Sequence, residues 1–330
     1  MPWRTLLIAL SLLLAGLGPA QPAAAGDPGP VRLAVVTKPG ASQNLLSEKF
    51  AALLAAQGEN GLKIEILHSG AAGNETQIVA KLRSGELQMA VVTAGIYDQA
   101  APETAAVEYP FLFADYAQAD RALQGPAGAA LLNSLESAGL KGLAFGENGF
   151  RHLTNNLRPV NSVADVAGLR LRVMESRLQE ELWRTLGAAP APHPWPINDF
   201  LAQGKADGQE NPLWVIKTYD LAKLQKHLSL TGHVYSAHIC AANLAWFNRL
   251  APAQRQALTA AMLAAAAHQR QLNRQHEAAI LQDLQAAGMQ VVERPDRASF
   301  MAKAAALAGS PLVSAGPVKA MLDQFRAALK

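Results

Sequence analysis

Two arginines and an asparagine stand out because their side chains can bind a carboxylate. Arg151 lies in the run G-F-R-H-L-T-N, Arg172 in G-L-R-L-R-V, and Asn211 in D-G-Q-E-N-P. Both arginine runs follow a glycine and are typical of strands, and no acidic residue lies directly beside either arginine. An arginine without a carboxylate of its own chain indicates that a ligand supplies one, since the planar guanidinium offers it paired donors. We therefore predict an organic-anion site.

All three side chains have structural alternatives, since arginines in strands often form interlobe or surface ion pairs. Asp165 or Glu175 could form an ion pair with Arg151 and remove it from a ligand site. Asn211 could cap a helix that begins at Pro212, as asparagine often does, and such a cap is compatible with a ligand contact. The sequence leaves these alternatives open.

The aromatic and histidine side chains form no catalytic pattern. Trp195 and Trp214 are either apolar walls of the site or ordinary packing residues. His233 and His238 are five residues apart and His193 lies far upstream, which is not the spacing of a metal cluster. The sequence contains no H-E-x-x-H, G-x-S-x-G or P-loop motif. We expect no enzymatic activity, no metal and no cofactor.

The N-terminus has the pattern of a secretory signal. It begins with M-P-W-R, continues with an apolar run over residues 5–17, and reaches A-A-A just before Gly26. A basic start, a short apolar core and small residues at the cleavage site indicate export, and the core is shorter than the ~20 residues that a membrane helix needs. We expect residues 1–25 to be a signal peptide cleaved near Ala25-Gly26, and the mature protein to be periplasmic. The single Cys240 excludes an intrachain disulfide.

Length and charge limit the possible partners. The mature part of about 305 residues exceeds the usual size of one core and predicts two domains. The chain has 29 Lys and Arg against 26 Asp and Glu, without a basic block, which argues against nucleic acid as a partner. We expect a monomer.

The first third of the mature chain alternates predicted strands and helices, which implies a parallel sheet with crossover helices. Ligands bind such sheets where the strands end. These ends are residues 38–44, 68–76 and 93–97. The predicted strands are 31–37, 62–67 and 87–93, and the helices are 45–57 and 77–83.

A second unit begins near Gly149, and a long helix follows it. Residues 252–287 are predicted as one helix, with a proline in its first turn and a glycine after its end. At 1.5 Å per residue it would be roughly 54 Å long, which fits a strut across two lobes. The other predicted elements are strands 169–174 and 189–193, helices 179–186 and 196–203, extended segments 228–235 and 239–247, and helices 298–307 and 318–329.

An ordered set of motifs covers nearly the whole mature chain. The sequence resembles the solute receptors of TRAP transporters, the DctP-type extracytoplasmic binding proteins. The motifs are E-Y-P-F-L-F at 108–113, G-F-R-H-L-T-N at 149–155, R-P-V at 158–160, D-V-A-G-L-R-L-R-V at 165–173, L-G-A at 186–188, D-G-Q-E-N-P at 207–212, T-G-H at 231–233 and N-L-A-W-F at 243–247.

The resemblance implies a periplasmic-binding-protein-like α/β fold. Two α/β lobes, joined by crossing strands and a long strut helix, would close on a small organic acid. We expect lobe I to comprise residues 26–148 with 236–275 returning to it, and lobe II to comprise 149–235 with 276–330 completing it.

The resemblance also implies roles for particular residues. Arg172 would form a bidentate salt bridge with the ligand carboxylate, Arg151 would assist, and Asn211 would contact the same carboxylate. Trp195 would form a wall. Loop residues of the first lobe would decide which acid is accepted, and the candidates there, from their place after the second and third strands, are Asn74, Glu75, Thr93 and Tyr97.

The implied function is transport. The receptor would deliver its carboxylate ligand to the small and large membrane subunits of a TRAP transporter. A periplasmic sensor that passes its signal to a membrane protein has the same fold and is the alternative. A dicarboxylate, a sugar acid and a keto acid all remain possible ligands.

Overall fold

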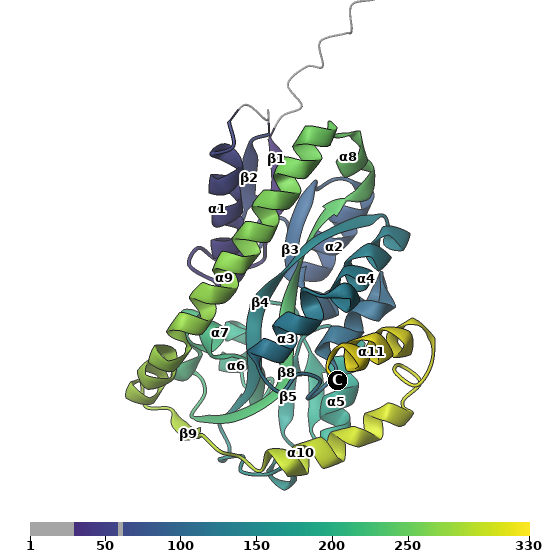
Figure 1. Cartoon of the computed structure of the whole chain (residues 1–330). Helices are drawn as coiled ribbons and strands as arrows, with labels where there is room; N and C mark the ends of the chain where they lie inside the picture. The colour runs from purple at the N-terminus through teal and green to yellow at the C-terminus, as the bar shows by residue number, and fades with distance from the viewer. Residues whose placement is uncertain (1–29, 59–61) are drawn as a thin grey trace, which may run out of the picture.

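The computed structural model describes residues 30–58 and 62–330 (Figure 1). The expected signal peptide, residues 1–25, lies outside the described residues. Within the part that is described, none of the helices combines the length and the apolar character needed to cross a membrane.

The first unit alternates strands and helices, as predicted. Strand β1 pairs in parallel with both β2 and β3. Asn74 caps α2 by accepting a hydrogen bond from the backbone N–H of Gln77, and Gly85 ends this helix with a left-handed φ of 84°. The elements are β1 (Val31–Ala34), α1 (Ser42–Ala55), β2 (Ile64–Leu67), α2 (Glu75–Ser84) and β3 (Met89–Thr93).

The second unit repeats this pattern around three strands of its own. Strand β5 pairs in parallel with β6 on one side and with β7 on the other. Its elements are β5 (Arg170–Val173), α5 (Arg177–Leu186), β6 (Ala189–Pro192), α6 (Asn198–Ala202), β7 (Gly208–Pro212) and α7 (Leu213–Thr218).

Two long antiparallel strands, β4 (Leu140–Asn155) and β8 (His227–Asn243), join the units. Within the described residues they complete a nine-stranded sheet of order β2-β1-β3-β8-β4-β7-β5-β6, with β9 (Gln290–Val292) paired to β8. The two extended segments predicted at 228–235 and 239–247 are therefore largely one strand. At the crossing, Gly149 has a φ of 114° and the register shifts beside it.

Helices cover both faces of the sheet. In β3 and β8, Val91 and Cys240 pack towards α1 and α9 (Pro252–Ala286), while Val92 and Ile239 pack towards α2 and α11 (Gly316–Ala328). Cys240 is fully buried, as expected for a small apolar residue. The remaining elements are η1 (Ala94–Gln99), η2 (Pro102–Glu108), α3 (Tyr116–Leu123), α4 (Pro126–Ser134), η3 (Leu135–Ala138), η4 (Val163–Val166), η5 (Leu221–Lys223), α8 (Leu244–Arg249), α9 (Pro252–Ala286), α10 (Arg297–Ala304), η6 (Ala305–Gly309) and α11 (Gly316–Ala328).

Helix α9 is the predicted strut. It packs against α1 and β4, and further along against α7, so it touches both units (Figure 1). Gln269 accepts from the backbone N–H of Glu147, and Asn273 donates to its carbonyl. Arg274 forms ion pairs with the carboxylates of Glu147 and Asp120. The strut is therefore anchored to β4 at the crossing between the two units.

The C-terminal helices pack on different units. Helix α10 adds Phe300 to the core of the second unit. Helix α11 instead buries Leu322 and Phe325 against η2 and α4 of the first unit. This contact differs from the expectation that residues 276–330 all complete the second lobe, because the apolar stripe of α11 meets the apolar surface of η2.

Glu108, at the end of η2, is a carboxyl group buried between the units. It is 0% exposed. Ser236 of β8 donates to its Oε1 at 3.1 Å, and Gln179 of α5 donates to its Oε2 at 3.5 Å. Burial raises the pKa of Glu108 to about 7, although the nearby charge of Arg151 opposes this rise.

Replacing Glu108 with glutamine is expected to stabilise the protein at pH 8 by roughly 3 kcal/mol at most, and to change it little at pH 5. The pKa of this acid is higher in the folded chain than its ordinary value of 4.5. The folded wild type therefore holds a proton that the unfolded chain loses, and its stability falls as pH rises from about 4.5 to 7. Glutamine removes that loss. Urea unfolding at both pH values measures the difference, and equal effects at pH 5 and pH 8 would contradict it.

Candidate ligand-binding site

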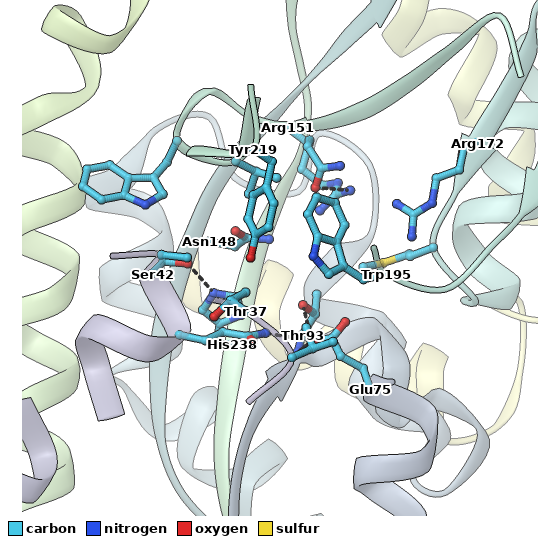
Figure 2. Close-up of a pocket in the computed structure, with 17 residues that line it drawn as sticks. Thr37, Ser42, Glu75, Thr93, Asn148, Arg151, Arg172, Trp195, Tyr219 and His238 are labelled. Atoms are coloured by element: carbon cyan, nitrogen blue, oxygen red, sulfur yellow. Dashed lines mark hydrogen bonds between the residues drawn. The ribbon is translucent and has the colours of Figure 1, made fainter. Parts of the chain in front are cut away.

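A cavity lies where the two units meet, with about 500 Å³ of space when the solvent at its mouth is included (Figure 2). It is formed by the ends of β1 and β3 on one side, by β5 and β7 on the other, and by the crossing strands β4 and β8. Its lining residues are Val36, Thr37, Ala41, Ser42, Gln43, Glu75, Thr93, Asn148, Arg151, Arg172, Met174, Trp195, Asn211, Trp214, Val215, Tyr219 and His238.

Arg172 contributes a buried charge to this cavity. It extends from β5 with 3% of its surface exposed. Its Nε donates to the carbonyl of His193 at 2.8 Å, and its Nη2 donates to the same oxygen. Among the described residues, no carboxylate lies within ion-pair distance of it. Burial lowers the pKa of Arg172 to about 10, so the guanidinium remains protonated at neutral pH.

Arg151, in contrast, has a carboxylate partner within the protein. Its Nη2 donates to Glu210 Oε1 at 2.7 Å, and its Nε contacts Glu210 Oε2. Pairing of β4 with β7 aligns Glu210 with Leu153, two residues from Arg151 and therefore on the same face of the sheet. The prediction that Arg151 lacks a carboxylate of its own chain is therefore wrong.

Neither of the two partners considered for Arg151 contacts it. Asp165 instead accepts hydrogen bonds from the backbone N–H groups of Asn161 and Ser162. Glu175 accepts one from the hydroxyl of Thr76 across the cleft. The acid that pairs with Arg151 is Glu210. It lies 59 residues further along the chain, so no local sequence pattern indicated this pair.

Glu210 is held as a carboxylate by several donors. His233 Nε2 donates to its Oε2 at 3.1 Å, and His233 Nδ1 accepts from the hydroxyl of Thr231 at 2.8 Å. Burial alone would raise the pKa of Glu210, but the Arg151 charge and these hydrogen bonds outweigh it and lower the pKa to about 2. Arg151 and Glu210 thus form a neutral pair, which leaves Arg172 as the unpaired cation of the described cavity lining.

Arg151 and Asn211 still present donors and acceptors to the cavity. Arg151 Nη1 is buried without a hydrogen-bond partner. Asn211 Oδ1 accepts from Arg151 Nη2 at 3.2 Å, and Asn211 Nδ2 donates to Gln209. Asn211 belongs to strand β7 and does not cap α7, whose N-cap is Pro212 without a side-chain bond.

Glu75 and Thr93 face the cavity from the first unit, as predicted. Glu75 is the first residue of α2, and Thr93 ends β3. Glu75 Oε1 accepts from the Thr93 backbone N–H at 2.8 Å, from the Thr93 hydroxyl at 2.9 Å, and from Gln43 Nε2 at 2.7 Å. The carboxylate of Glu75 is thereby fixed in position.

The other two first-unit candidates do not line the cavity. The side chain of Asn74 is used in the N-cap of α2, and Asn74 lies beside a neighbouring surface pocket. Tyr97 is 0% exposed and packs in the core of the first unit. The 3-10 turn after β3 points this ring inward. Its place after the strand was predicted, but its side-chain direction was not.

Aromatic side chains wall the cavity on the second unit. Trp195 lies beside Arg172, and the guanidinium carbon is 6.0 Å from the centroid of the indole ring. The rings of Trp195 and Tyr219 meet edge-on, with their centroids 4.5 Å apart. Trp214 has a buried Nε1 without a partner. Tyr219 reaches across the cleft, where its hydroxyl accepts from the backbone N–H of Lys38 at 3.0 Å.

The sequence did not reveal several polar lining residues. Ser42 and Gln43 lie within residues 38–44, the segment predicted to follow the first strand, but neither was predicted as a ligand-binding residue. His238 is fully buried in β8, and its Nε2 lies 3.0 Å from the hydroxyl of Ser42. Burial lowers the pKa of His238 to about 3, so it is neutral. Only the register of β8 shows that its side chain faces the cavity. No cluster of three or more His, Cys, Asp or Glu side chains that could hold a metal occurs within the described residues.

The chain is similar to proteins that bind organic acids. It is 33% identical over 260 residues to the 2,3-diketo-L-gulonate-binding periplasmic protein YiaO of Escherichia coli (strain K12), covering 78% of this chain and 79% of that protein. A TRAP periplasmic solute-binding protein from Polaromonas sp. JS666, solved with D-erythronate, has 31% identity and a TM-score of 0.84, over 90% of this chain and 98% of that one.

A second solved structure agrees. The sugar acid binding protein DctPAm of Advenella mimigardefordensis, in complex with galactonate, has 30% identity and a TM-score of 0.86, over 91% of this chain and 99% of that one. These similarities confirm the predicted fold class. The sequence profile of the bacterial extracellular solute-binding proteins, family 7, matches residues 33–310. The chain therefore belongs to family 7 of the bacterial extracellular solute-binding proteins, the DctP family.

Proposed function

We propose that this receptor captures a small organic acid in the cavity between its two units, with one carboxylate of the ligand bound to Arg172. One observation carries the proposal: Arg172 is a buried cation on the cavity wall with no carboxylate partner among the described residues. A buried charge is costly unless it is paired. A ligand carboxylate supplies the missing partner.

The hydrogen bonds left open around Arg172 fit one carboxylate. Its Nε and Nη2 are committed to His193, and the rest of the guanidinium is available to a ligand. Arg151 Nη1 is a buried donor on the same cavity wall. Because Glu210 already neutralises Arg151, the two arginines together balance one negative charge from the ligand.

Delivery to a TRAP transporter follows from family membership. Members of this family are extracytoplasmic receptors, so we place the mature protein in the periplasm after removal of residues 1–25. The small and large membrane subunits are the proposed partners, and the receptor acts as a monomer.

The two units serve as lobes that meet at Gly149. Closure of these lobes on the ligand is the signal that the membrane subunits read.

A thermal-shift screen of organic acids tests the proposed function. At 100 times its Kd, a ligand adds about 2.7 kcal/mol of stability, enough to raise the melting temperature measurably. We expect sugar acids, dicarboxylates or keto acids to include at least one stabilising ligand. Stabilisation by neutral sugars alone, with every carboxylate inactive, would contradict the proposal.

Replacing Tyr219 with phenylalanine is expected to weaken ligand affinity about fivefold, chiefly through faster dissociation. The variant loses the hydroxyl that accepts from Lys38 across the cleft, and with it one contact of the closed form. Stopped-flow measurement of the dissociation rate checks the change. Tyr109→Phe is the matched control because Tyr109 does not line the cavity, and equal rates for all three proteins would exclude Tyr219 from closure.

A further inference from the structure

We propose that Glu75 selects a hydroxylated monocarboxylate as the ligand and excludes dicarboxylates. This inference rests on the proposed function, since it assumes that Arg172 holds the first carboxylate. It concerns the remainder of the ligand, which faces the first unit.

Glu75 places a negative charge in the cavity across from the two arginines. It extends from α2 of the first unit, whereas Arg172 extends from β5 of the second (Figure 2). Burial lowers the pKa of Arg172, and the charge of Glu75 partly opposes this and also favours the charged form of Arg151, so it acts across the cavity. Among the described residues, all hydrogen bonds to its carboxylate end on Oε1. Oε2 is left to accept from a ligand.

Other polar atoms on the cavity wall also lack partners. Four of them are buried and line the cavity: Thr37 Oγ1, Gln43 Oε1, His238 Nδ1 and Trp214 Nε1. Gln43 Oε1 only accepts, the indole N–H only donates, and the hydroxyl of Thr37 does both. Buried polar atoms without partners are costly, so a ligand that satisfies them is favoured.

Hydroxyl groups match this mixture of atoms. A hydroxyl both donates and accepts, so hydroxyl groups suit acceptors such as Glu75 Oε2 and Gln43 Oε1 as well as a donor such as Trp214 Nε1. An ammonium group only donates, and a carboxylate only accepts. A second carboxylate would also meet the negative charge of Glu75, and such like-charge contacts cost several kcal/mol. Lys38 lies over the ring of Tyr219 and does not line the cavity.

The test compares two ligand sets on the mature wild type and on Glu75→Gln by calorimetry. The monocarboxylates are D-erythronate, D-gluconate and D-galactonate, and the dicarboxylates are succinate and L-malate. We expect the best monocarboxylate to bind wild type at least about tenfold more tightly than the best dicarboxylate. In Glu75→Gln we expect this ratio to fall at least about fivefold. Glutamine keeps an oxygen for the three donors on Oε1, so the fold of the site is retained.

Glu175→Gln is the matched control. The charge of Glu175 also opposes the lowering of the Arg172 pKa by burial, but Glu175 does not line the cavity. In Glu175→Gln we expect the ratio of monocarboxylate affinity to dicarboxylate affinity to stay within about twofold of the wild-type ratio. A wild type that binds dicarboxylates as tightly as the polyhydroxy acids, or a ratio unchanged in Glu75→Gln, would overturn the role of Glu75 and leave the proposed function intact. Failure of every carboxylate to bind would overturn both.

Discussion

Replacing Arg172 with lysine is expected to weaken organic-acid binding about a hundredfold or more. Lysine keeps the positive charge but loses the planar fork that bonds the His193 carbonyl and a ligand carboxylate at once. The ligand carboxylate would then lie buried with incomplete hydrogen bonds. Calorimetric titration with the best ligand of the thermal-shift screen measures the loss.

Two further variants separate binding from folding. Arg170→Lys changes an arginine two residues earlier in β5, whose side chain forms an ion pair with Asp207. The ligand affinity of this variant should stay within about twofold of wild type. Arg172→Met should abolish binding while leaving the ligand-free protein at least as stable as wild type, because it removes a buried charge without a partner. Tight binding by Arg172→Lys or Arg172→Met would remove Arg172 from the site.

Replacing Glu210 with glutamine is expected to lower the free energy of unfolding by about 3–5 kcal/mol. The change leaves the charge of Arg151, 1% exposed, without its carboxylate, and it replaces one of the two oxygens that accept from Arg151 and His233 with an amide nitrogen that only donates. In a protein of this size the melting temperature should fall by on the order of 10 °C. Calorimetry of the ligand-free protein at pH 7 measures this fall.

The exposed pair Arg170–Asp207 is the matched control for Glu210. Asp207→Asn should cost less than about 1 kcal/mol, because solvent screens that pair. The Glu210 pair also predicts a pH effect. The pKa of this acid is lowered from 4.5 to about 2, so its stabilisation is present above pH 4.5 and is lost as pH falls towards 2. Equal losses for Asp207→Asn and Glu210→Gln would contradict the buried-pair assignment.

Local patterns predicted the elements of the fold well. The long helix was expected at 252–287 and lies at Pro252–Ala286, because a proline and a glycine mark its ends. Strand β8 was divided into two segments, since polar residues such as His238 interrupt its apolar pattern. These polar side chains are buried because they face the cavity and the crossing of the units, which only tertiary structure reveals.

The site was predictable where strand ends define it, and less so where strand pairing does. Arg172 and Thr93 line the cavity because they lie at or near the ends of parallel strands, and Glu75 does so because it begins the helix that follows β2. The partner of Arg151 depends on the register between β4 and β7, which no local pattern encodes. Tyr97 follows β3 as expected, but the turn there buries its ring.

A crystal structure of the protein with its most stabilising organic acid tests the central claim most directly. We expect the ligand carboxylate within hydrogen-bond distance of the Arg172 guanidinium, with one carboxylate oxygen also reaching Arg151 Nη1. A ligand whose carboxylate lies elsewhere in the cavity, with Arg172 bonded only to the carbonyl of His193, would contradict the claim.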